Sequence, residues 1–193
     1  MNIIDLQLHG AKLIEPVVHG DHRGFFMESY HEERYQQAGI NTTFIQDNHS
    51  LSQEAGVVRG LHYQLPPKEQ SKLVRVLSGA IYDVILDIRQ SSPTYGQWAG
   101  VILSEYNKRQ LYVPKGFAHG FCTLVPKTQV FYKVDEYYSP ELDKGIRWND
   151  PELAIDWPVS EPILSDKDKN HPFLKDAIIP MSRGSKSMWS DSD

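Results

Sequence analysis

Two short segments place a histidine among strand-forming residues and beside a turn-forming glycine. RGLHYQ carries Arg59 and His62, and VPKGFAHGF carries His119. The imidazole of histidine titrates near neutral pH, so it can serve as a general base, a hydrogen-bonding group or a metal ligand. These two segments are therefore the first candidates for a functional site.

The pair of segments resembles the two motifs of the cupin superfamily of small β-barrels. In that superfamily the first motif normally carries H-x-H and a glutamate, the second carries another histidine, and together they bind a metal. Here Gln64 stands where the second histidine would be, and Glu69 and Lys72 follow at no clear ligand spacing. A divalent ion needs three or four histidine or carboxylate ligands, and an inward Lys72 would repel it. We predict chemistry with no metal and no cofactor. We interpret the remaining histidines as exposed or structural and as lacking a metal-ligand partner at useful spacing: His9, His19, His22, His31, His49 and His171.

A closer resemblance covers most of the chain, roughly residues 21–168. Eight segments follow in order the motifs of the dTDP-4-dehydrorhamnose 3,5-epimerase family: DHRGFFMES, FIQDNHSLS, GVVRGLHYQ, SKLVRVLSGAIYDVILDIRQSSPTYGQW, QLYVPKGFAHGF, YKVDEYYSPE, IRWNDP and LSDKD. The resemblance implies inversion of carbons 3 and 5 of dTDP-4-dehydro-6-deoxy-D-glucose. Both carbons flank a ketone, so each can lose a proton to a base, leave charge on an enolate oxygen and regain a proton from the opposite face.

Such a reaction needs a base, an acid across the sugar ring and a cation at the enolate oxygen. The resemblance implies that His62 is the base and that Asp168 orients it and stabilises its cation. It implies that Tyr132 donates the returning proton and that Lys72 holds the enolate oxygen. Taken singly, each of these residues has an ordinary structural interpretation, as a hydrogen-bonded or solvated group. The eight ordered segments favour the functional one.

The resemblance also implies a set of substrate-binding residues. Arginine presents a planar fork of donors that suits a diphosphate, and tyrosine can stack on thymine. One departure from the family pattern follows YYSPE, where Asp143-Lys144 replaces the common Glu-Arg; this leaves the role of Asp143 open. The binding positions are Arg23, Phe26, Glu28, Gln46, Asn48, Arg59, His119, Tyr138, Asp143 and Lys167.

Short β-rich segments separated by Gly, Pro, Asn and Asp must position these residues, and they recur from about residue 43 to residue 158. We predict an all-β fold, a cupin-type jelly-roll barrel or sandwich with a few short peripheral helices. In IYDVILDI the even positions 82–88 are apolar, which predicts a half-buried strand with Asp83 and Asp87 on its other face. QVFYKV likewise puts Val130, Tyr132 and Val134 on one side.

The clearest helix candidate covers residues 30–38. Ser29 and Glu32 are spaced as a capping box, and Gly39 is suited to the C-terminal end. SSPTYG, VPKTQ and WNDPE cluster the residues that form turns. We predict one domain over residues 1–180 and a disordered tail over 181–193, where five serines accompany only three large apolar residues.

Composition sets outer limits on the function. The chain has 193 residues, a net charge of −5 and 40% hydrophobic residues, enough for one hydrophobic core. It has no basic block, which argues against binding to nucleic acid, and no apolar run that would span a membrane. The single cysteine, Cys122, excludes an intrachain disulfide, and the N-terminus lacks the pattern of a signal peptide. We expect a cytoplasmic protein.

The family implies a homodimer in which an N-terminal segment crosses to the neighbouring subunit, so that Arg23, Phe26 and Glu28 serve the partner's pocket. Three other functions remain open at this point. They are a single-site epimerase acting on carbon 3 or carbon 5, a metal-dependent cupin enzyme, and a binding module for sugars or nucleotide sugars.

Overall fold

The computed structural model describes residues 1–179, so the predicted tail at 181–193 lies outside the described residues. Strands dominate this range, and the helical segments are short. The strands are β1 (Asn2–Asp5), β2 (Lys12–Glu15), β3 (Val18–Asp21), β4 (Gly24–Met27), β5 (Gln46–Ser52), β6 (Val58–Gln64), β7 (Lys72–Ser78), β8 (Ala80–Asp87), β9 (Trp98–Ser104), β10 (Gln110–Val113), β11 (Phe117–Thr123), β12 (Thr128–Val134) and β13 (Asp143–Gly145). The helices are α1 (Glu32–Gln37), α2 (Asp166–Lys169) and the 3₁₀ turn η1 (Leu174–Asp176).

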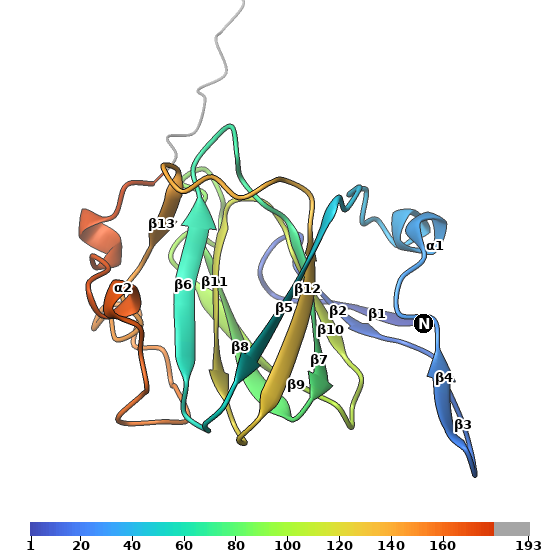
Figure 1. Ribbon diagram of the computed structural model, residues 1–193. Coiled ribbons are helices and arrows are strands. Elements are labelled where there is room, and N and C mark those ends of the chain that lie inside the picture. The colour runs from blue at the N-terminus through green and yellow to red at the C-terminus, as the bar shows by residue number, and fades with distance from the viewer. Residues whose placement is uncertain (180–193) are drawn as a thin grey trace, which may run out of the picture.

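Two antiparallel sheets face each other (Figure 1). One has six strands in the order β1-β2-β10-β7-β12-β5, and the other has five in the order β13-β6-β11-β8-β9. Each sheet keeps its own edge strands, so within residues 1–179 the architecture is a sandwich and not a closed barrel. The predicted all-β fold is confirmed.

The main core lies between the two sheets, where apolar residues of both inner faces meet. Val74 and Val76 of β7 and Val130 of β12 pack there with Ile81 and Ile85 of β8. The outer face of the five-stranded sheet is also buried, because residues 146–179 fold over it and contribute Ile146, Leu153 and Trp157. Because burial of apolar surface is favourable, this second layer stabilises the strands that carry the site.

The second layer corrects the prediction of a half-buried strand at residues 81–88. The even residues of β8 do face one side, but that side is covered by the C-terminal segment, and the odd residues face the main core. Asp83 and Asp87 are fully buried, at 0% exposure each. Alternation alone identifies the two faces of a strand and does not reveal that both are covered.

The predicted range of the strands, 43–158, was wrong at both ends. Four strands precede residue 43, and the last strand, β13, ends at Gly145. Each of the four early strands has only four residues, which is too short for a clear alternating pattern. The apolar side chains of residues 146–158 pack on the sheet from turns and irregular segments, which form no strand.

The predicted helix is confirmed as α1, but its predicted cap was wrong. The helix starts after His31, and no side chain caps it. The Ser29 carbonyl accepts a hydrogen bond from Gln110 Nε2 at 2.9 Å, and Glu32 accepts one from Thr43 Oγ1 at 3.3 Å. Because the helix begins at Glu32, Ser29 lies two residues before the N-cap position, and the pair cannot form a capping box. Gly39 follows the helix end with a φ of +81°, as expected for a glycine there.

The three predicted turn segments lie at turns, although the end of VPKTQ already belongs to β12. None of the helices within residues 1–179 has the length and apolar composition that crossing a bilayer would need.

Candidate active site

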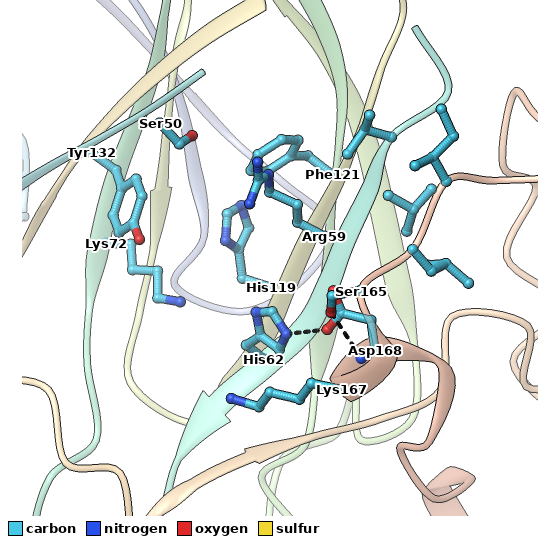
Figure 2. Close-up of a pocket in the computed structure, with 14 residues that line it drawn as sticks. Ser50, Arg59, His62, Lys72, His119, Phe121, Tyr132, Ser165, Lys167 and Asp168 are labelled. Carbon is cyan, nitrogen blue, oxygen red and sulfur yellow. Dashed lines mark hydrogen bonds and ion pairs between the residues drawn. The ribbon is translucent and has the colours of Figure 1, made fainter. Parts of the chain in front are cut away.

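A cavity of about 440 Å³ opens between the two sheets and is lined by all four predicted catalytic residues (Figure 2). The five-stranded sheet contributes Arg59, His62 and His119, and the six-stranded sheet contributes Lys72 and Tyr132. Side chains of residues 163–168 close one side, among them Lys167 and Asp168. The cavity therefore has chemically active groups on two opposite walls.

Glycines bring the two histidine-bearing strands close together. Gly60 of β6 has a φ of +124°, and a Cβ there would lie 2.6 Å from Gly120 Cα. A Cβ at Gly120 would lie 2.7 Å from the Arg59 carbonyl oxygen. Only glycine permits this approach. As a result, His62 and His119 are direct cross-strand neighbours between β6 and β11.

His62 and Asp168 meet although 106 residues separate them in the chain. Nε2 of His62 lies 2.5 Å from Oδ1 of Asp168. Asp168 belongs to α2, and the hydroxyl of Ser165, the N-cap residue just before that helix, accepts a hydrogen bond from the Asp168 backbone N–H at 3.1 Å. With Nε2–H donating to the carboxylate, Nδ1 of His62 is free to accept a proton. This is the geometry of an oriented general base.

Burial and charge act in opposite directions on the pKa values of this pair. Burial lowers the pKa of His62, and the carboxylate of Asp168 offsets part of that effect. For Asp168, burial alone would raise the pKa, but contacts with His171 and His62 outweigh it and hold the pKa well below its usual range. Asp168 is therefore ionised whenever His62 is neutral and ready to accept a proton.

His171 is the third member of this cluster. The sequence analysis predicted no metal-ligand partner for it, and that prediction was wrong. Its Nε2 lies 3.3 Å from the same Oδ1 of Asp168, and its ring centroid is 5.5 Å from that of His62. The interpretation of His171 as structural agrees with its burial, at 7% exposure. Its spacing, three residues after Asp168 and just past the end of α2, was the sequence signal that could have predicted this contact.

The three groups His62, Asp168 and His171 keep their ligand atoms within 4.8 Å of one another, so they are also the candidate metal cluster of residues 1–179. The 2.5 Å between His62 Nε2 and Asp168 Oδ1 is a hydrogen-bond distance. Two ligands bound tetrahedrally to zinc at about 2.0 Å would stand roughly 3.3 Å apart. The His62–Asp168 pair therefore has hydrogen-bond spacing, and a metal would have to push these two atoms apart, whereas His171 Nε2 makes no hydrogen bond within residues 1–179.

Lys72 and Tyr132 lie side by side on the opposite wall. The Lys72 Nζ is 6.0 Å from the centre of the Tyr132 ring. Burial lowers the pKa of Lys72 to about 8, with Asp143 and Asp83 opposing the shift. Burial also raises the pKa of Tyr132, so its hydroxyl keeps its proton at neutral pH. A protonated tyrosine and an ammonium group are thus available across the cavity from His62.

His119 has a carboxylate partner that sequence reasoning placed on a solvent-facing side. Oδ1 of Asp83 lies 2.6 Å from Nε2 of His119, and both side chains are buried. The signal for this pair was the presence of two aspartates in an otherwise apolar strand, since buried carboxylates need partners. The cavity wall therefore carries two imidazole–carboxylate pairs on neighbouring strands.

Arg59 and Lys167 add positive charge at the cavity. The Arg59 side chain donates to Ser52 Oγ at 3.3 Å, and Lys167 forms an ion pair with Asp143. Asp143 also accepts a hydrogen bond from the Tyr138 hydroxyl at 3.0 Å. Tyr138 itself is 57% exposed, which leaves its ring face open. The replacement at position 143 thus keeps an acidic group that links Lys167 and Tyr138.

The other predicted binding residues lie outside the cavity lining. Asn48 of β5 is the cross-strand partner of Tyr132, and Gln46 donates to Asn48 at 2.9 Å. Arg23 and Phe26 belong to the β3–β4 hairpin, which projects away from the sandwich in Figure 1. Glu28 follows this hairpin and pairs with Arg34. Within one chain, the residues of this hairpin are not brought to the site.

Comparison with known proteins agrees with this arrangement. Residues 5–176 match the model of a family described as dTDP-4-dehydrorhamnose 3,5-epimerase. A protein of that name from Shigella flexneri is 51% identical over 178 residues, covering 92% of this chain and 98% of its own length.

Solved structures of similar fold are also epimerases of this kind. The dTDP-4-dehydrorhamnose 3,5-epimerase of Bacillus anthracis, with TDP and PPi bound, is 59% identical with a TM-score of 0.88, covering 89% of this chain and 98% of its own. The dTDP-6-deoxy-D-glucose-3,5-epimerase of Legionella pneumophila, in complex with dTDP-4-keto-L-rhamnose, is 49% identical with a TM-score of 0.89, covering 94% and 98%. The cupin-like fold predicted from the sequence is confirmed by these neighbours. With a family model matched along almost its full length and relatives near half identity, this chain belongs to the dTDP-4-dehydrorhamnose 3,5-epimerase family.

Proposed function

We propose that this chain converts dTDP-4-dehydro-6-deoxy-D-glucose to dTDP-4-dehydro-L-rhamnose by epimerising carbons 3 and 5, on the route to activated L-rhamnose. The observation that carries this proposal is the 2.5 Å His62–Asp168 pair on one wall of a cavity whose opposite wall presents Lys72 and Tyr132. Membership of the family supports it.

The residues have distinct roles in the proposed reaction. Nδ1 of His62 takes the proton from a carbon next to the ketone, and Asp168 stabilises the imidazolium that forms. The electron pair of the broken C–H bond moves to the carbonyl oxygen, where the ammonium group of Lys72 stabilises the enolate. Tyr132 then returns a proton to the same carbon. No electron is gained or lost overall, so the reaction needs no redox cofactor.

The two-sheet arrangement supports inversion in place of simple exchange. His62 belongs to the five-stranded sheet and Tyr132 to the six-stranded sheet, so a sugar ring held between them meets the base on one face and the acid on the other. A proton removed from one face and replaced from the opposite face inverts the carbon.

Binding of the nucleotide follows from charge. Arg59 and Lys167 supply positive charge for the diphosphate, and the exposed ring of Tyr138 supplies a stacking surface for thymine. His119, Gln46, Asn48 and Asp143 complete the proposed binding set within the chain.

We further propose a cytoplasmic homodimer in which the β3–β4 hairpin reaches the partner's cavity and delivers Arg23, Phe26 and Glu28. The exposure of Phe26, 72%, supports this, because a large aromatic side chain on a projecting hairpin gains free energy when a partner covers it.

The experiment that tests the function is solvent-hydrogen exchange into dTDP-4-dehydro-6-deoxy-D-glucose in deuterium oxide. The wild type is compared with His62→Asn and Tyr132→Phe. Double epimerisation places deuterium at carbons 3 and 5, and deuterium at one carbon only would identify a single-site epimerase. Ligand binding with no exchange at either carbon would identify a binding module.

A further inference from the structure

Asp83 lies on β8, between β11 and the edge strand β9 of the five-stranded sheet, with a side chain that no solvent reaches. One carboxylate oxygen, Oδ1, faces His119 Nε2 at 2.6 Å. The other, Oδ2, has no hydrogen-bond partner within residues 1–179. A buried carboxylate with an unsatisfied oxygen is costly for folding, so its retention calls for a specific reason.

Asp87, four residues further along the same face of β8, is a buried carboxylate with a structural role, and it provides the comparison for Asp83. Both of its oxygens are engaged by donors of the following turn, from Arg89, Ser92 and Thr94. Burial alone would raise the pKa of Asp87, yet these hydrogen bonds bring it down to about 2. Asp87 therefore anchors a turn, and Asp83 has no comparable structural task.

Asp83 lies instead beside the groups of the cavity. Its partner His119 lines the cavity as the cross-strand neighbour of His62. Lys72 has no carboxylate within 4.0 Å among residues 1–179; burial lowers its pKa, and the negative charges of Asp143 and, after it, Asp83 oppose that shift. The charged and titratable groups around Lys72 are Asp83 of β8, Asp143 of β13, Arg59 and His62 of β6, His119 of β11, Tyr132 of β12 and Lys167 of α2.

We propose that Asp83 is a positioning residue of the active site, which holds His119 with Nε2–H turned inward and Nδ1 toward the substrate, and which serves as the buried counter-charge of Lys72. The inference rests on the proposed function. It assigns to Asp83 the same orienting task for His119 that Asp168 performs for His62. It also accounts for the unpaired Oδ2, because a carboxylate oxygen without a hydrogen bond still contributes negative charge near the cavity.

The test compares Asp83→Asn with Asp87→Asn, a matched loss of a buried carboxylate from the same face of the same strand. We expect Asp83→Asn to lower kcat about 10- to 100-fold with less than a threefold change in KM. The high-pH limb of its kcat profile should move down by about one pH unit, because Lys72 loses its proton earlier without the negative charge. Asp87→Asn should lower the Tm and leave kcat and its pH profile unchanged.

A readout without substrate separates this inference from the proposed function. The pKa of Lys72 is followed in the free protein by NMR of lysine side chains, assigned with Lys72→Arg, and should fall in Asp83→Asn but not in Asp87→Asn. The tautomer of His119 is read in the wild type from its ring nitrogens, so this part of the test holds even if Asp83→Asn does not fold. We expect Nε2 to carry the proton.

Each outcome decides something. An unchanged Lys72 pKa and pH profile in folded Asp83→Asn, or a His119 protonated only at Nδ1, overturns the inference. A wild type that exchanges no solvent hydrogen into the sugar overturns the proposed function while leaving the NMR results valid.

Discussion

Replacing Asp168 by asparagine tests the proposed base most directly, because it removes one charge and little volume. The asparagine of the Asp168→Asn variant would still offer an amide oxygen to His62 Nε2, so the ring can keep its place. What disappears is the negative charge that stabilises the imidazolium formed in the reaction. The carboxylate is 5% exposed and has contacts with both His62 and His171, so water cannot replace that charge.

The expected loss follows from what the pair does. Burial already lowers the pKa of His62, and Asp168 is the main group that raises it again. Without the carboxylate His62 is a weaker base, and general acid–base catalysis is worth roughly 10²–10⁴-fold. At about 1.4 kcal/mol for each factor of ten, this is a loss of about 3–5 kcal/mol of transition-state stabilisation. The effect should fall on kcat, since the substrate does not bind Asp168.

The assay is the rate of deuterium incorporation at carbons 3 and 5, measured over a range of pH. His62 acts when neutral, so activity is lost as the pH falls through its pKa. Asp168→Asn lowers that pKa and should shift the acid limb to lower pH. Asp166→Asn is the control, since Asp166 lies in the same helix with its side chain 97% exposed. A folded Asp168→Asn protein with a rate within threefold of the wild type would refute the assignment of the dyad.

Four further predictions concern other parts of the molecule. Lys72→Ala should lower kcat by a factor that corresponds to about 3–4 kcal/mol, the usual worth of an oxyanion donor, with a small change in KM, as steady-state kinetics can establish. Arg23→Ala should raise KM more than it lowers kcat, and light scattering should find a dimer; a fully active monomer would contradict the exchange of the hairpin. Treatment with a chelator should leave the rate unchanged, and loss of activity that added metal restores would support a metal-dependent enzyme instead. Acid should destabilise the fold: the pKa of Asp87, about 2, is below its unfolded value near 3.9, so its contribution of about 2–3 kcal/mol is complete above pH 5 and is lost as the pH falls through 2. Asp87→Asn should flatten that part of the dependence of unfolding free energy on pH.

The sequence alone determined the class of fold and most of the chemistry. Alternation in β8 and β12 identified strands, and the inward face of β12 placed Tyr132 correctly beside Val130 and Val134. The eight ordered segments pointed to a family, since residue types in a fixed order persist where the chemistry persists. Gly39 ended the first helix as expected, because a left-handed φ favours glycine.

The tertiary structure decided which of these residues meet. His62 and Asp168 are 106 positions apart, and no local pattern encodes the distance between a strand and a later helix. Asp83 had the sequence signature of an exposed strand residue, and only the packing of the six-stranded sheet on one face of β8 and of residues 146–179 on the other showed that both faces are covered. His171, two residues after the end of α2, has its Nε2 3.3 Å from Asp168 Oδ1, which the chain positions alone do not reveal. Spacing along the chain reports local geometry, whereas burial and pairing depend on segments that fold back from far away, and those two quantities set the pKa values on which the proposed reaction depends.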